Sequence, residues 1–131
     1  MLKLENIVAG YGHITALKNI SLEVPQGSIV SLIGANGAGK STTMKTIMGL
    51  VKPTSGKVLF EGQDITGHKT HQIVHGGISL VPEGRQILQD MSVYENLEMG
   101  AYIRNDNEIE ADIKKVFKRF QIGRASCRER V

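Results

Sequence analysis

The sequence is poor in the residues that cross-link a protein or anchor it in a membrane. Its 131 residues contain one cysteine, no tryptophan and 5% aromatic residues. A single thiol excludes an internal disulfide framework. The longest apolar runs, such as Ile29–Ile33, are far too short to cross a bilayer, so we expect no membrane-spanning segment. Lys3, Glu5 and Asn6 interrupt the early hydrophobic stretch, so we also expect no signal peptide and a cytoplasmic location.

Basic residues are in excess, with a net charge of +3 and a pI near 9.1, a balance that often accompanies nucleic-acid binding. Arg124, Arg128, Arg130 and the single cysteine, Cys127, all stand in the last eleven residues, 121–131. Without this tail, thirteen basic and twelve acidic residues remain, a net charge of +1. The body of the chain therefore predicts no nucleic-acid partner and no thiol chemistry.

The tail also departs from the pattern that precedes it. Residues 108–120 carry apolar side chains at helical spacing, whereas residues 121–131 have no such period. The tail closely resembles the conceptual translation of a common sequencing adapter. We therefore expect residues 1–120 to be native and residues 121–131 to be a non-native addition. The alternative is a natural, arginine-rich and solvated C-terminus.

The order of the predicted elements indicates an α/β protein. We expect strands at 2–9, 20–24, 28–33, 57–60 and 78–81, and helices at 41–50, 68–75, 91–102 and 108–120. Ser28–Ile33 and Ile78–Val81 are nearly all apolar, as are strands buried on both faces of an α/β sheet. Ser92 and Glu95 have the spacing of a capping box at the start of the third helix.

One segment, Gly34–Thr42, fits the phosphate-binding pattern G-x-x-x-x-G-K-[ST]. Its last two glycines allow successive backbone N–H groups to point at a phosphate, and the helix that follows directs its positive end at the same anion. Lys40 supplies a charge for the β- and γ-phosphates, Ser41 a hydroxyl for Mg²⁺, and Thr42 a hydroxyl on the α-phosphate side. The predicted context, after a buried strand and opening a helix, argues against a chance glycine-rich turn. The expected nucleotide contacts are Gly34, Asn36, Gly37, Ala38, Gly39, Lys40, Ser41 and Thr42.

Further segments resemble the ATPases of ABC transporters, and together they cover essentially all of residues 1–120. They are Ala9–Gly12, Leu50–Lys57, Phe60–Ile65, Val81–Leu88 and Met91–Leu97. The resemblance implies a P-loop NTPase fold, here a partial ABC nucleotide-binding domain: a β-rich N-terminal lobe, a phosphate-binding core and the start of a helical subdomain. It also implies that Tyr11 stacks on adenine, an interaction of about 1–3 kcal/mol where bases stack on aromatic rings. Taken alone, Tyr11 could equally be an ordinary aromatic residue at the end of a strand.

Glu83 stands where most of this family has the glutamine of the Q-loop. The resemblance implies that its side chain senses the γ-phosphate and Mg²⁺, so Glu83 is, together with Lys40, a candidate catalytic residue and, with Ser41, a metal ligand. The alternative is a surface acid on a loop. The VPEGR form at 81–85, together with Gly34–Gly37, most resembles the LivF-type ATPase of branched-chain amino-acid importers.

Three histidines, His68, His71 and His75, are spaced so that one side of a helix could present them. No cysteine or carboxylate stands beside them at ligand spacing. Solvated surface histidines are therefore the better interpretation.

The resemblance further implies ATP and Mg²⁺ as cofactors, a second ATPase subunit and membrane permease subunits as partners, and a peripheral position on the inner face of the plasma membrane. Family members hydrolyse ATP with a signature motif, an Asp–Glu pair and a histidine, none of which this chain contains; all would lie beyond Phe120. We therefore expect the 131 residues to bind ATP at best, without turnover. The alternatives are the ATPase of a urea or other small-solute importer and a binding-only nucleotide module. A P-loop kinase is a poorer fit, because it explains neither Tyr11 nor Val81–Leu97.

Overall fold

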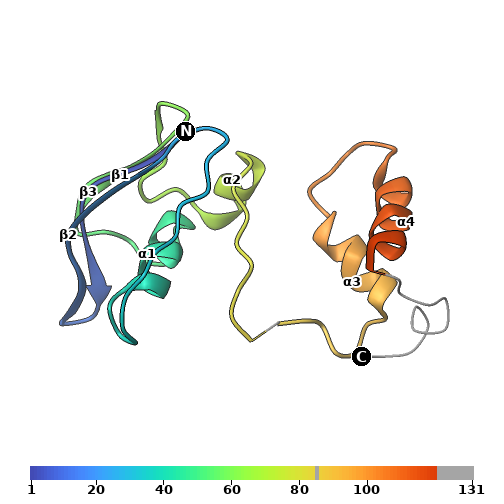
Figure 1. Cartoon of the computed structure of the whole chain (residues 1–131), viewed down its shortest axis with the longest axis horizontal. Coiled ribbons are helices and arrows are strands. Elements are labelled where there is room, and N and C mark those ends of the chain that lie inside the picture. Colours follow the sequence, from blue (N-terminus) through green and yellow to red (C-terminus); the bar gives the residue numbers. More distant parts are fainter. Residues whose placement is uncertain (85, 121–131) are drawn as a thin grey trace. The chain divides into compact units, whose positions relative to one another are not determined.

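A computed structural model describes residues 1–84 and 86–120 of the chain. The chain divides into two compact units, residues 1–80 and residues 81–131 (Figure 1). The expected non-native tail, 121–131, lies outside the described residues.

The first unit is built on a four-stranded antiparallel sheet with the strand order β2-β1-β3-β4. The strands are β1 (Leu2–Tyr11), β2 (Ile14–Val24), β3 (Ser55–Phe60) and β4 (Gln63–Asp64). Strand β2 begins six residues earlier than the sequence pattern predicted, because the chain reverses directly after β1 and pairs Tyr11 with Ile14. The short strand β4 was not predicted. The buried core of this unit comprises Leu4, Ile7, Ala9, Leu17, Ile47, Val51 and Val58.

Two short helices belong to this unit, α1 (Lys40–Ile47) and α2 (Thr70–His75). Both predicted helices are confirmed: α1 begins one residue earlier and ends three residues earlier than predicted, and α2 begins two residues later. After α1 the Leu50 N–H donates to the Lys45 carbonyl (2.9 Å) and the Gly49 N–H to the Thr46 carbonyl (3.1 Å). Gly49 has φ +70°, so this pair of bonds is the Schellman ending that glycine favours. The terminating role predicted for Gly49 is therefore confirmed.

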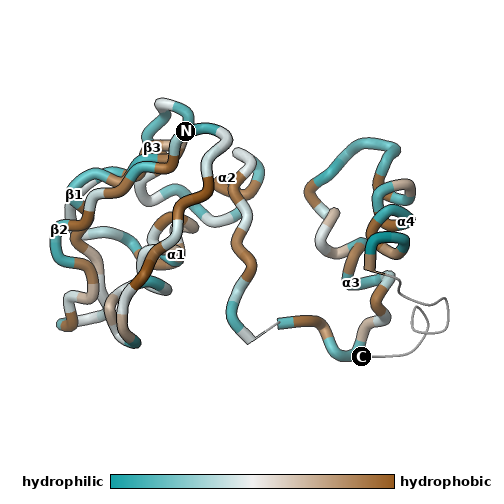
Figure 2. Tube along the Cα trace, viewed as in Figure 1, coloured by the Kyte–Doolittle hydropathy of each residue, from teal (hydrophilic) through white to brown (hydrophobic). Residues whose placement is uncertain are grey.

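The two buried strands predicted at Ser28–Ile33 and Ile78–Val81 are wrong for this structure. Neither segment forms a strand, and Ile29 and Ile33 are 97% and 96% exposed. The apolar character of the connection between β2 and α1 is visible as brown in Figure 2. A strand is buried on both faces only when neighbouring strands pair with it and helices cover it. No strand among residues 1–84 and 86–120 pairs with either segment.

The second unit is a pair of helices, α3 (Val93–Gly100) and α4 (Ile109–Phe120). The predicted capping box at the start of α3 is confirmed. The Ser92 N–H donates to Glu95 Oε2 (2.7 Å), and the Glu95 N–H donates to Ser92 Oγ (3.3 Å). Helix α4 buries Ile113, while its polar residues form charge pairs on the outside.

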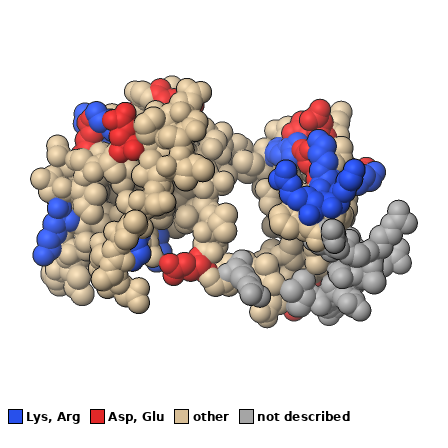
Figure 3. Space-filling model, viewed as in Figure 1, with Lys and Arg blue, Asp and Glu red and all other residues tan. Residues whose placement is uncertain are grey.

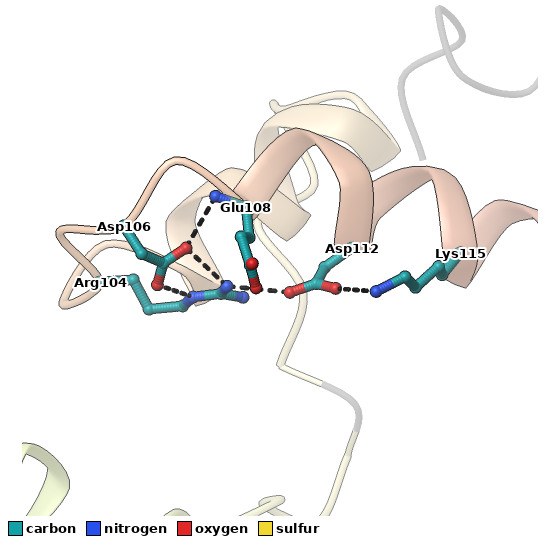
Figure 4. Close-up of polar contacts among 5 residues, drawn as sticks. All are labelled: Arg104, Asp106, Glu108, Asp112 and Lys115. Carbon is teal, nitrogen blue, oxygen red and sulfur yellow. Dashed lines mark hydrogen bonds and ion pairs between the residues drawn. The ribbon is translucent and has the colours of Figure 1, made fainter.

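A charged network closes the loop between α3 and α4 (Figure 4). The Arg104 guanidinium donates to both carboxylate oxygens of Asp106 at 2.8 Å and lies 2.9 Å from Asp112. Asp112 also pairs with Lys115 at 2.9 Å. These contacts raise the pKa of Arg104 and lower the pKa of Asp106 and of Asp112 below the ordinary 3.8. Charges of both signs are therefore interspersed on this unit (Figure 3).

This network predicts an acid-sensitive helix pair. Because the folded-state pKa of Asp106 and of Asp112 is lowered, their stabilising contribution is fully present above the unfolded value of 3.8 and is lost as the pH falls through the folded values. The urea concentration at which half of the helical circular-dichroism signal is lost should therefore be lower at about pH 3 than at about pH 6. Arg104→Gln should show a smaller fall over the same range. Equal falls in the two proteins would show that the network is too well solvated to matter.

Candidate functional site

The loop that precedes α1 is shaped by a tight turn. The Ala38 N–H donates to the Ala35 carbonyl at 3.1 Å, which places Asn36 and Gly37 at the two central positions. Gly37 has φ +85°, the conformation that glycine supplies at the third position of such a turn. A Cβ built on Gly37 would meet no atom within 4 Å, so this side of the loop faces open space. The loop therefore has room for a ligand beside its backbone.

Gly39 fixes the end of the same loop against the sheet. Its φ is +93°, and a Cβ at this position would lie 2.7 Å from Leu17 Cδ2 and 3.1 Å from the Ala16 carbonyl oxygen. Leu17 is fully buried in β2, where close packing leaves its side chain little room to shift. The Gly39 carbonyl then accepts the Thr43 N–H at 2.8 Å, which starts the hydrogen-bond pattern of α1. Gly39 thus stands at the N-cap of α1 and packs closely against β2.

The Lys40 side chain folds back over the loop that precedes it. Its Nζ donates to the Gly34 carbonyl at 2.7 Å and to the Ala35 carbonyl at 2.8 Å. The positive charge is therefore held at the start of the loop, close to the N-terminus of α1, where the helix dipole also favours an anion. A full positive charge beside the N-terminus of a helix favours the binding of an anion.

The hydroxyl groups at the start of α1 differ in exposure. Ser41 is exposed, whereas Thr42 and Thr43 are buried. The Thr43 hydroxyl donates to the Gly39 carbonyl (2.9 Å) and the Thr46 hydroxyl to the Thr42 carbonyl (2.8 Å). These two hydroxyl groups are therefore satisfied by carbonyls one turn earlier in the chain. The nucleotide contacts of Ser41 and Thr42 stay predictions, as do those of the exposed Asn36 and Ala38.

Tyr11 lies at the end of β1, and the structure brings it to α1. The Lys45 ammonium is 6.0 Å from the centroid of the Tyr11 ring. Lys45 and Ser41 are four residues apart in the helix, so they share one face of it. The ring that was predicted to stack on a base and the helix that opens at the phosphate loop thus belong to one local arrangement. Sequence reasoning missed Lys45, although its spacing from Ser41 was a usable signal.

Glu83 lies in the second unit, on an exposed turn. Gly84 follows with φ +78°, and the Gln86 N–H donates to the Gly84 carbonyl at 2.7 Å. Further along the chain, the Asn96 side-chain amide forms hydrogen bonds with the segment before α3. Its Oδ1 accepts the Leu88 N–H, and its Nδ2 donates to the Leu88, Met91 and Ser92 carbonyls at 3.0–3.2 Å. These hydrogen bonds of Asn96 were not predicted from the sequence. The role of Glu83 in catalysis and Mg²⁺ binding stays a prediction.

The residues in 1–84 and 86–120 contain no group of three or more histidine, cysteine or carboxylate side chains that could hold a metal ion. His71 and His75 are both exposed. The Mg²⁺ contacts predicted for Ser41 and Glu83 stay predictions.

Comparison with protein families decides the wider relationship. The model of the family described as ABC transporter matches residues 17–130, most of the chain. The chain belongs to the ABC transporter family. The predicted family resemblance is thereby confirmed.

The names of individual relatives refer to the transport of different solutes. BraG of Pseudomonas aeruginosa, a high-affinity branched-chain amino acid transport ATP-binding protein, is 39% identical over 120 residues, covering 92% of this chain and 52% of the relative. LivG of Methanocaldococcus jannaschii, a probable branched-chain amino acid transport ATP-binding protein, is 40% identical over 100 residues, 76% of this chain and 39% of the relative. SrtF of Streptococcus pyogenes, a lantibiotic transport ATP-binding protein, is 39% identical over 99 residues, 76% of this chain and 41% of the relative.

Solved structures confirm the predicted α/β fold of a P-loop NTPase. An ATP-binding cassette of an ABC transporter, MJ1267, has a TM-score of 0.80 at 30% identity, covering 98% of this chain and 57% of that one. The same cassette in its ADP conformation has a TM-score of 0.71 at 35% identity, covering 87% of this chain and 45% of that one.

The chain spans about half the length of the curated relatives it matches. No helix within its described part is long and apolar enough to cross a membrane.

Proposed function

We propose that this chain is the nucleotide-binding front part of an ATPase subunit of an ABC importer. The observation that carries the proposal is the position of the Lys40 ammonium, 2.7–2.8 Å from two carbonyls of a loop whose backbone opens beside Gly37. The loop residues Gly34–Thr42 would hold the phosphates, Tyr11 the adenine, and Ser41 with Glu83 the Mg²⁺. When bound, Mg²⁺ supplies charge neutralisation between the β- and γ-phosphates.

Titration calorimetry of the 131-residue chain with Mg-ATP tests this proposal. We expect saturable binding that weakens when Mg²⁺ is withheld, because the ion screens the phosphate charge. Adenosine serves as the control, since it carries the base without phosphates. Binding of adenosine as tight as that of Mg-ATP, or no heat with Mg-ATP, would overturn the assignment of the loop.

Catalysis is a separate matter, and we propose that the 131 residues do not turn over ATP. Phosphoryl transfer requires in-line positioning of the nucleophile together with charge neutralisation, and a phosphate loop alone supplies only part of the second. The complete site would include a signature motif from a second ATPase subunit, and permease subunits would couple it to transport at the inner face of the membrane. Steady phosphate release that Lys40→Ala abolishes would contradict this.

For the transported solute we propose branched-chain amino acids. BraG and LivG support this choice, and so does the VPEGR form around Glu83. The similar identity of SrtF means that overall identity does not select the solute. Deleting the gene should lower leucine uptake by the source cells and leave urea uptake unchanged. The reverse result would favour a urea importer.

We further propose that residues 1–120 are the front part of the ATPase domain and that residues 121–131 are not native. The coding sequence past codon 120 in genomic DNA tests this directly. It should continue into a signature motif, an Asp–Glu pair and a histidine. A stop codon directly after Val131 would instead favour the binding-only module.

A further inference from the structure

Lys45 has no role in the phosphate-binding pattern, yet the structure places it between the two halves of the proposed nucleotide site. It is an exposed residue in the last turn of α1, on the face of the helix that also carries Ser41. The two residues are four positions apart, which corresponds to about 6 Å along the helix axis. The phosphate loop lies at one end of this face and Lys45 at the other.

The partner of Lys45 is the Tyr11 ring. The distance of 6.0 Å from Nζ to the ring centroid is at the outer limit at which a cation and an aromatic face attract each other appreciably. Tyr11 is 48% exposed, so the ring keeps much of its surface free while Lys45 lies over it. The backbone beneath the ring is constrained, because a side chain at Gly10 would collide with the Ile14 carbonyl across the hairpin. The ring is therefore held at its backbone by the turn and at its face by Lys45.

We infer that Lys45 is a positioning residue for the nucleotide base: its ammonium holds the Tyr11 ring against α1 so that the free face of the ring can stack on a heteroaromatic base. The inference rests on the proposed function, in which Tyr11 stacks on adenine while the loop binds the phosphates. Ordering the ring before the nucleotide arrives lowers the entropic cost of binding. Because the pair is solvent-exposed and long, its loss should weaken base binding only about two- to fivefold.

A purely structural role for Lys45 is the competing explanation. A positive charge in the last turn also stabilises a helix through its dipole, so removing the charge could loosen α1 and the loop together. The two explanations differ in which ligands they affect. A loosened helix weakens every phosphate ligand, whereas a misplaced ring weakens only ligands that carry a base.

The test compares Mg-ATP with inorganic triphosphate, which has the phosphates without the base. We expect Lys45→Met to weaken Mg-ATP binding about two- to fivefold and to leave triphosphate binding unchanged. Lys45→Arg should restore Mg-ATP binding, since a guanidinium also stacks on aromatic rings. Lys52→Met, the same change at an exposed lysine after α1, is the matched control and should affect neither ligand.

A double-mutant cycle with Tyr11→Ala completes the test. If Lys45 acts through the ring, Lys45→Met should add no further loss of Mg-ATP affinity in the Tyr11→Ala background. Equal losses for ATP and triphosphate, or full additivity of the two changes, would overturn the inference about Lys45 alone. If Tyr11→Ala itself spares Mg-ATP binding, the stacking role in the proposed function fails. If the unaltered chain binds no Mg-ATP, both fail.

Discussion

Replacing Lys40 with alanine should weaken Mg-ATP binding by about one to two orders of magnitude. The substitution removes the full charge that the structure holds over the Gly34 and Ala35 carbonyls. Hydrogen bonds to charged groups contribute about 1.5–3 kcal/mol each, which corresponds to about 10- to 150-fold in affinity. Backbone N–H groups and the dipole of α1 remain, so we expect residual binding and not complete loss.

Titration calorimetry with Mg-ATP measures this effect, and circular dichroism checks that α1 and the sheet persist. Lys52→Ala removes the same charge from an exposed position outside the loop, so it separates a specific contact from a change in net charge. Salt sharpens the comparison, because long-range attraction weakens with ionic strength while a direct contact is screened less. Equal losses for Lys40→Ala and Lys52→Ala would mean that Lys40 does not contact the phosphates.

Substituting alanine at Gly39 should destabilise the first unit by about 2–5 kcal/mol, the sum of left-handed backbone strain and an overpacked contact. The added methyl group would meet the buried Leu17 side chain and the Ala16 carbonyl. The same substitution at Gly37 carries the backbone strain alone, since that position faces open space, and should cost about 1–2 kcal/mol. The two glycines of one loop thus serve different purposes.

Urea unfolding followed by far-UV circular dichroism gives both free energies. The paired design matters, because both residues have positive φ, +85° for Gly37 and +93° for Gly39, and differ in what surrounds the missing side chain. Equal destabilisation by the two substitutions would show that the loop moves away from β2 at little cost. In that case the packing of Gly39 would not determine where α1 begins.

The sequence predicted best those features whose causes are local. The phosphate loop is specified by glycines and a lysine within nine residues, and the capping box of α3 by two residues three positions apart. Helix α4 was anticipated from its apolar period and begins within one residue of the expected position. Each of these features depends on backbone preferences or on side chains within one or two helical turns. Such local causes can be read directly from neighbouring residues in the sequence.

The wrong predictions concern segments whose structure depends on distant partners. Ser28–Ile33 has the composition of a buried strand, yet composition gives only the capacity to pair, and no described strand supplies the pairing. Conversely, the first residues of β2 carried no strong strand signal and became strand because β1 lies beside them. Strand propensity depends largely on packing against neighbouring strands, so it predicts a strand poorly where those neighbours are unknown.

The sequence by itself determined the helix that follows the loop at 34–42 and membership of the ABC transporter family, and it predicted phosphate binding by that loop. Tertiary structure alone decided that Gly39 packs on Leu17, that Lys45 lies over Tyr11 and that Arg104 joins Asp106 to Asp112. The physical reason is the range of the interactions. A loop motif works through adjacent residues, whereas the first two of these contacts join segments of the chain that only folding brings together, and the third needs the turn into α4.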